Sequence, residues 1–185
     1  MRKKKKNALR MYAAVGIFSA IAVILQMMGN VLPKVSGFLE IELSDLPALI
    51  LAFAFGPFAG VLCELIKNLI HCFFSTTGFV GEFANFVVNG IFCYVAGSMY
   101  QKQKTKMSAV VALTLATLTM ALAGIFTNLY IMIPLYAPQM EHQAKTALVT
   151  GVILPFNLIK GAAISVIVLL IYKKISPILH KQKHR

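Results

Sequence analysis

The basic residues of this 185-residue chain are concentrated in three short segments, and this distribution constrains the fold more than any other feature. Most Lys and Arg residues lie in segments 1–10, 100–107 and 173–185. None of the six Asp and Glu residues lies there, and long apolar stretches separate the three segments. Short loops rich in Lys and Arg stay on the cytoplasmic side of a membrane. The three segments are therefore predicted to share that side, which requires an even number of crossings between them.

The composition also indicates a membrane protein, because 58% of the residues are hydrophobic, compared with about 45–50% in soluble domains. We predict an all-α integral membrane protein with a single membrane domain over residues 1–185. The net charge of +12 does not indicate nucleic-acid binding, since the basic residues lie at predicted membrane edges without aromatic interleaving or a binding motif. The N-terminus resembles a signal peptide, but its apolar run continues to Met28. We therefore predict an uncleaved first helix.

Six apolar segments, of which the second is short, are predicted to cross the membrane as helices. Asp45 suits the N-cap of the second span, and Gly56-Pro57 separates this span from the third. Loops are expected at residues 30–44, 75–81 and 134–145. With a cytoplasmic start, six crossings place both termini and the segment 100–107 in the cytoplasm, so hydropathy and charge agree. The predicted spans are 10–29, 46–56, 57–74, 82–100, 108–133 and 148–172.

Polar side chains in the fifth and sixth spans are candidate ligand-binding groups, because a polar group inside a bilayer needs a partner or a purpose. Asn157 and Lys160 are three residues apart and share a helix face, and Pro155 is expected to disturb the preceding turn. At 1.5 Å per residue, Asn157 lies roughly 13 Å and Asn128 roughly 9 Å below the outer ends of their spans. The amides and the ammonium are thus expected to converge in the outer half of the bundle, where they suit a small polar or aromatic ligand. The structural alternative is hydrogen bonding between helices.

The third span contains the i,i+3 pair Glu64 and Lys67, for which we predict a buried ion pair. The alternative is one arm of a proton relay or of a ligand site. His71, near the outer end of this span, is predicted to be a satisfied interfacial residue and not a metal ligand. Asn68, Asn85 and Asn89 are further polar residues within the spans.

Neither a metal site nor a catalytic site is predicted. The three cysteines lie in apolar stretches without metal-binding or redox spacing. No P-loop, His-Glu-x-x-His or Gly-x-Ser-x-Gly motif is present. The chain is therefore not expected to be an enzyme or to carry a cofactor, and any ATP-driven role needs a partner chain.

The first span contains Gly16-x-x-x-Ala20. Small residues at this spacing let membrane helices approach closely. The motif is common, and it serves either packing within the chain or contact with a partner helix.

Five segments in chain order resemble the S components of energy-coupling factor (ECF) vitamin transporters, and the last two resemble the riboflavin-specific members. The resemblance covers about residues 8–180. The Asp-Leu-Pro and Pro-Phe-Asn-x-x-Lys patterns are fairly specific together. The segments are EIELSDLPAL (40–49), FGPFAG (55–60), ELIKNLIH (64–71), GEFANF (81–86) and LPFNLIKG (154–161).

This resemblance implies a six-helix substrate-binding subunit in the plasma membrane of a bacterium, which works with a transmembrane coupling protein and two ATPase subunits. It implies that riboflavin is the transported ligand and that Asn128, Asn157 and Lys160 hold it in an outward pocket. Asp45, at the border of the first loop, is a further candidate. The resemblance also implies that the small-residue motif of the first span docks on the coupling protein.

Two other classes are weighed against this interpretation. The first is a self-sufficient, proton-coupled secondary transporter of a small vitamin-like molecule, with Glu64, Lys67 and His71 in the coupling. The chain shows no repeated broken helices in two corresponding halves, which many such transporters have. The second is a small membrane enzyme, for which the sequence offers no paired nucleophile and base. Another flat, vitamin-like ligand remains open as an alternative to riboflavin.

Overall fold

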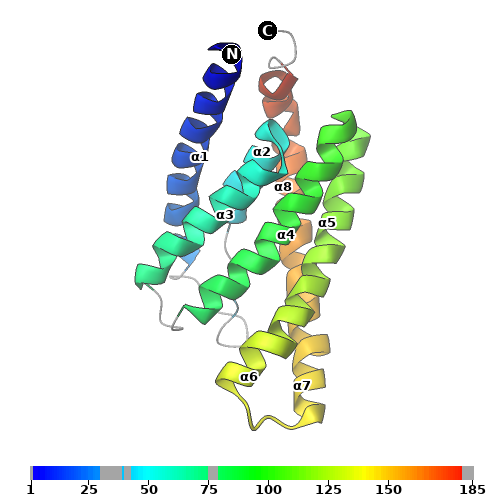
Figure 1. Ribbon diagram of the computed structural model, residues 1–185. Helices are drawn as coiled ribbons and strands as arrows, with labels where there is room; N and C mark the ends of the chain where they lie inside the picture. Colours follow the sequence, from blue (N-terminus) through cyan, green and yellow to red (C-terminus); the bar gives the residue numbers. More distant parts are fainter. Residues whose placement is uncertain (1, 30–38, 40–42, 75–78, 181–185) are drawn as a thin grey trace.

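The computed structural model describes residues 2–29, 39, 43–74 and 79–180, and within these ranges the side chains of residues 8–171. The described residues form a bundle of helices (Figure 1), which confirms the all-α prediction over this part of the chain. The predicted loops 30–44 and 75–81 lie mostly outside the described residues. The elements are α1 (Arg2–Gly29), α2 (Asp45–Phe55), α3 (Pro57–His71), η1 (Cys72–Phe74), α4 (Val80–Gln103), α5 (Lys106–Thr127), η2 (Asn128–Met132), α6 (Ile133–Tyr136), α7 (His142–Leu148), η3 (Val149–Ile153) and α8 (Leu154–His180).

Five helical segments of the described chain are long and apolar enough to cross a membrane. The predicted second span corresponds to α2, which has 11 residues and extends over about 16 Å. This is about half of a hydrocarbon core of roughly 30 Å, so the count of six crossings stays a prediction. The five segments are Ala8–Gly29, Pro57–Phe74, Val80–Gln103, Lys106–Tyr136 and His142–Ile171.

The helix ends that carry the basic segments and the helix ends that carry α6 and α7 lie at opposite ends of the bundle. The start of α1, the end of α8 and the junction between α4 and α5 lie at one end, and α6 and α7 meet at the other (Figure 1). The backbone of the three basic segments thus comes together at one end, as far as these segments are described. This is the arrangement that the charge distribution predicts.

The break between α2 and α3 occurs at Gly56, as predicted. Its φ of 105° is a conformation that favours glycine, and Pro57 begins α3 in the first turn, where its missing N–H costs least. The two helices pack closely behind this break. A Cβ atom at Gly60 would lie 2.7 Å from the Cβ atom of Ala52, so α2 and α3 require glycine at this crossing.

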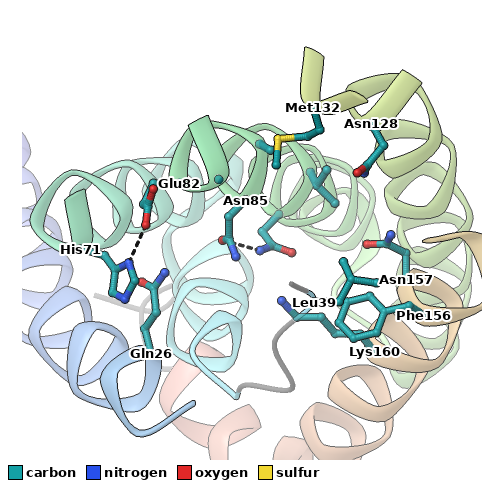
Figure 2. Close-up of a pocket in the computed structure, with 14 residues that line it drawn as sticks. Gln26, Leu39, His71, Glu82, Asn85, Asn128, Met132, Phe156, Asn157 and Lys160 are labelled. Carbon is teal, nitrogen blue, oxygen red and sulfur yellow. Dashed lines mark hydrogen bonds and ion pairs between the residues drawn. The ribbon is translucent and has the colours of Figure 1, made fainter. Parts of the chain in front are cut away.

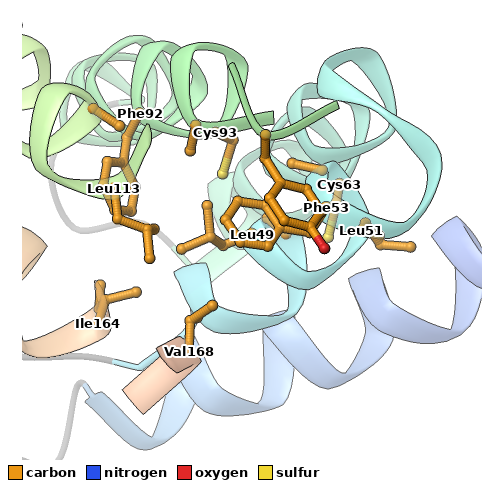
Figure 3. Packing of buried hydrophobic residues seen from close by; sticks show 14 of the residues in the cluster. Leu49, Leu51, Phe53, Cys63, Phe92, Cys93, Leu113, Ile164 and Val168 are labelled. Carbon is orange, nitrogen blue, oxygen red and sulfur yellow. The ribbon is translucent and has the colours of Figure 1, made fainter. Parts of the chain in front are cut away.

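The main hydrophobic core lies where α2 packs against the surrounding helices. The rings of Phe53 and Tyr100 are stacked with their centroids 4.1 Å apart. Figure 3 shows part of this core, whose buried side chains come from α1, α2, α3, α4, α5 and α8. They include Leu49, Leu51, Phe53, Cys63, Phe92, Cys93, Leu113, Ile164 and Val168.

Two π-helical segments interrupt the fifth and sixth long helices, and each ends two residues before a proline. In η2 the N–H of Ile133 donates to the carbonyl of Asn128, and in η3 the N–H of Leu154 donates to that of Val149. A proline has no N–H, and its ring clashes with the carbonyl four residues earlier in a regular helix. The wider turns relieve this conflict ahead of Pro134 and Pro155.

The predicted loop 134–145 is therefore wrong in its extent. Pro134 lies inside α6, because the π segment before it lets the helix continue to Tyr136. After the connection, helical structure resumes at His142. The remaining loop is Ala137–Glu141.

Candidate ligand-binding cavity

A cavity of about 150 Å³ lies inside the bundle, between two walls of different chemistry. We call these the α5–α8 wall and the α1–α4 wall (Figure 2). The ends of α1 and α3 and the start of α4 border the cavity, so it lies in the half of the bundle remote from the basic segments. The α5–α8 wall contains Asn128, Met132, Phe156, Asn157 and Lys160, and the α1–α4 wall contains Gln26, His71, Glu82, Asn85 and Asn89.

The α5–α8 wall brings together three residues that the sequence predicts to converge: Asn128, Asn157 and Lys160. Asn128 opens the π segment η2, and Asn157 follows Pro155 by two residues. The Nδ2 atom of each asparagine donates to a backbone carbonyl of its own helix, at 2.8 Å for Asn128 and 2.9 Å for Asn157. This fixes both side chains and leaves the Oδ1 atom and the second N–H of each amide to other partners.

Close packing of α5 against α8 holds Asn157 in place. A Cβ atom added to Gly124 of α5 would lie 2.5 Å from Nδ2 of Asn157. Gly124 also supplies the carbonyl that accepts from Asn128. One glycine thus makes room for one amide and orients the other.

Beside this wall, four ionisable side chains from α2, α3 and α8 form one network, and three of them are buried. Asp45 binds Lys67 at 2.6 Å through Oδ1 and Lys160 at 2.9 Å through Oδ2. Lys67 also binds Glu64 at 2.7 Å, which confirms the predicted ion pair. Asp45, Glu64 and Lys67 have no exposed side-chain surface. With two acids and two bases the network is neutral overall, which is the condition under which charges can be buried.

Asp45 occupies a different place from the one predicted. The sequence suggests a residue at the outer border of the first loop, but in the structure Asp45 is fully buried. The physical reason is that α2 begins inside the bundle, where the carboxylate compensates ammonium groups from two other helices. Asp45 does not line the cavity and reaches it only through Lys160.

The α1–α4 wall is the part that the sequence analysis did not assign. His71 contacts Glu82 through Nδ1 at 3.0 Å, so the predicted satisfied histidine has a carboxylate partner. Asn89 donates from Nδ2 to Oδ1 of Asn85 at 2.8 Å. Gln26 completes the wall from α1. A polar residue within a membrane span is a sequence signal for a cavity-lining position. The sequence does not show, however, that the polar faces of α1, α3 and α4 point into the same cavity.

The small-residue motif of α1 faces away from the bundle. Gly16 and Ala20 are exposed, whereas Val15 and Ser19 on the other face are buried. A Cβ atom at Gly16 would meet nothing within 4 Å in the described part of the chain. Of the two uses weighed for this motif, packing within the chain does not fit this geometry.

A helical membrane bundle with an internal polar cavity is typical of a protein that binds a small molecule. Comparison with known proteins specifies the class, because the family model "ECF transporter, substrate-specific component" matches residues 10–172. The chain belongs to this family of S components. With its five long apolar helices, it is a multi-pass protein of a bacterial plasma membrane.

Individual relatives agree along nearly the whole chain. Riboflavin transporter RibU of Staphylococcus aureus (strain TCH60) is 31% identical, and the match covers 97% of each chain. Riboflavin transporter FmnP of Bacillus subtilis (strain 168) is 34% identical over 91% of this chain and 93% of the relative.

Solved structures show the same fold. A structure of the S component of a bacterial ECF transporter superposes with a TM-score of 0.80 at 32% identity, covering 93% of this chain and 98% of the other. ThiT from Listeria monocytogenes, at 18% identity and a TM-score of 0.57, shares the fold alone.

Proposed function

We propose that this chain is the riboflavin-binding S component of an ECF transporter. Its relatives that match over more than nine-tenths of the chain are named riboflavin transporters. The observation that carries the proposal is that Asn128, Asn157 and Lys160 line one cavity beside the ring of Phe156. Amides and an ammonium group match the carbonyls and the N–H at the polar edge of a flavin ring, and apolar side chains match its faces.

In this proposal the chain binds and releases riboflavin but does not hydrolyse ATP. A transmembrane coupling protein and two ATPase subunits supply the energy, and Gly16 and Ala20 form the docking surface on the outer face of α1. Glu64 and Lys67 are neutralised within the network of Asp45, so no observation favours their use in proton coupling. The chain is a single membrane domain with six crossings and both termini in the cytoplasm.

The topology predicts which residues a reagent can reach from outside. In a chain whose three cysteines are replaced by alanine, we expect a membrane-impermeant thiol reagent to label Gln139→Cys in intact cells. Gln103→Cys should react only after the membrane is opened. Both side chains are exposed in the structure, so a difference in labelling reports the side of the membrane. The opposite pattern would contradict the proposed orientation.

Binding itself is tested by Asn157→Ala. Loss of one hydrogen bond to a buried ligand group costs about 1–3 kcal/mol, so the Kd for riboflavin should rise roughly 5- to 150-fold. Quenching of flavin fluorescence by the purified protein measures this Kd.

The matched control is Asn68→Ala. Asn68 is also a buried amide that donates to a carbonyl four residues earlier in its helix, at 2.8 Å, but it does not line the cavity. Its replacement should leave the Kd within about twofold of the wild-type value, well below the effect of a lost hydrogen bond. Equal effects of the two substitutions would mean that Asn157 acts only by joining helices.

A further inference from the structure

Lys160 joins the cavity to the network of ionisable side chains behind it. Its side chain lines the cavity and is 9% exposed, and its Nζ atom lies 2.9 Å from Oδ2 of Asp45. Asp45 begins α2 and has no exposed side-chain surface, so it does not contact a ligand in the cavity itself. An ammonium group has three N–H donors and can contact a carboxylate and a ligand at the same time. A carboxylate outside the cavity can thus control a donor inside it.

Both ends of the Lys160 side chain are fixed by contacts between helices. At the backbone, α8 packs tightly on α5, since a Cβ atom added to Gly161 would lie 2.9 Å from Cγ2 of Thr117. At the tip, Asp45 holds the ammonium group. Lysine has a flexible four-carbon stem, and immobilising a flexible side chain when a ligand binds reduces affinity. The ion pair therefore orders Lys160 before a ligand arrives.

The carboxylate of Asp45 is itself fixed through its other oxygen atom. Oδ1 accepts a hydrogen bond from Lys67 of α3 at 2.6 Å, and Lys67 also contacts Glu64 at 2.7 Å. One carboxylate thus lies between two ammonium groups that come from α3 and α8. Without it these two like charges would repel each other, so Lys160 would no longer be held where it lines the cavity.

We propose that Asp45 is a positioning residue for ligand binding, which holds the ammonium group of Lys160 at the cavity without contacting the ligand. This inference rests on the proposed function, in which Lys160 contacts riboflavin. Asp45→Asn should weaken riboflavin binding at least about 3-fold, because Lys160 then has to be ordered when the ligand binds. Lys160→Met removes the donor itself and should weaken binding roughly 5- to 150-fold.

A double-mutant cycle on the Kd for riboflavin tests whether Asp45 acts through Lys160. If it does, Asp45→Asn has no further effect once Lys160 is replaced, so the double variant should match Lys160→Met within about twofold. The double variant loses one charge of each sign and keeps the ion pair of Lys67 with Glu64, so it is expected to fold. Quenching of flavin fluorescence by monodisperse protein gives all four Kd values. Losses that multiply in the double variant, or an unchanged Kd in Asp45→Asn, would overturn the proposal.

Glu64→Gln is the matched control for a general loss of stability. Glu64 is a fully buried carboxylate of the same network, but its ion pair is with Lys67. At a temperature at which the variant is folded, its Kd should stay within about twofold of the wild-type value, below the effect of a lost hydrogen bond. A loss equal to that of Asp45→Asn would show that the network affects binding only through stability, which contradicts positioning. Failure of the wild-type protein to bind riboflavin would overturn the proposed function, and the role of Asp45 with it.

Discussion

Replacing Asp45 with asparagine is expected to destabilise the protein by about 3–5 kcal/mol, because it leaves Lys160 and the fully buried Lys67 with only one carboxylate, Glu64, in the network. For a chain of this size, that is a fall in Tm on the order of 10 °C. The loss is larger than for a surface pair, since no water reaches Asp45 or Lys67 to replace the missing charge. Thermal unfolding of the purified protein in detergent, followed by circular dichroism, measures the change.

Two further variants separate the role of the network from that of charge in general. Glu141→Gln removes an exposed carboxylate and should alter stability by no more than about 0.5 kcal/mol. The double variant Asp45→Asn with Lys67→Met removes one charge of each sign, so it should be more stable than Asp45→Asn alone. If the two substitutions simply add, Asp45 and Lys67 are not energetically coupled, and the network does not stabilise the fold as described.

Introducing leucine at Gly16 or Ala20 is expected to abolish ATP-dependent riboflavin uptake and leave riboflavin binding unchanged. Both positions are exposed on α1 and neither lines the cavity. A Cβ atom at Gly16 also meets nothing within 4 Å in the described part of the chain, so we expect a larger side chain at either position to leave the inside of the bundle undisturbed. It does keep a partner helix at a distance, because close helix contact in membranes depends on small residues. Uptake by vesicles that contain the coupling protein and the ATPases, together with co-purification of these subunits, measures the effect.

Ala162→Leu is the matched control, since Ala162 is a small, exposed residue on another helix, α8. This variant should transport normally. Wild-type vesicles without the ATPase subunits should show no uptake, whereas a self-sufficient secondary transporter would be active in them. Normal uptake by Gly16→Leu and Ala20→Leu would exclude α1 as the docking surface. Simultaneous loss of binding would instead place both residues in the packing of the bundle.

Local patterns in the sequence were sufficient to predict the helices and one wall of the cavity. Apolar runs and the positions of Lys and Arg define the helices, because both reflect the membrane as a solvent. The sequence predicted that one cavity would hold Asn128, Asn157 and Lys160, because helical spacing fixes the face of each side chain and the rise per residue fixes its depth. Likewise, Glu64 and Lys67 pair within a single helix, so their spacing was enough.

The features that could not be predicted depend on how separate helices are rotated against each other. Asp45 meets Lys67 and Lys160 only because α2 begins inside the bundle, and no local pattern records that path. Gln26 and Asn89 lie on different helices, far apart in sequence, and nothing in either segment identifies a shared cavity. The length of the helix beyond Pro134 was missed for a different reason: a proline normally ends a helix, and the π turn that accommodates it has no clear sequence signature.

The central claim, that this chain binds riboflavin without its partners, is tested most directly by the purified protein alone. We expect it to show the visible absorption of a bound flavin when purified from riboflavin-fed cells. Flavin-free protein should quench the fluorescence of added riboflavin in a saturable titration with one site per chain. Protein that remains monodisperse, carries no flavin and gives no saturable quenching would contradict the account.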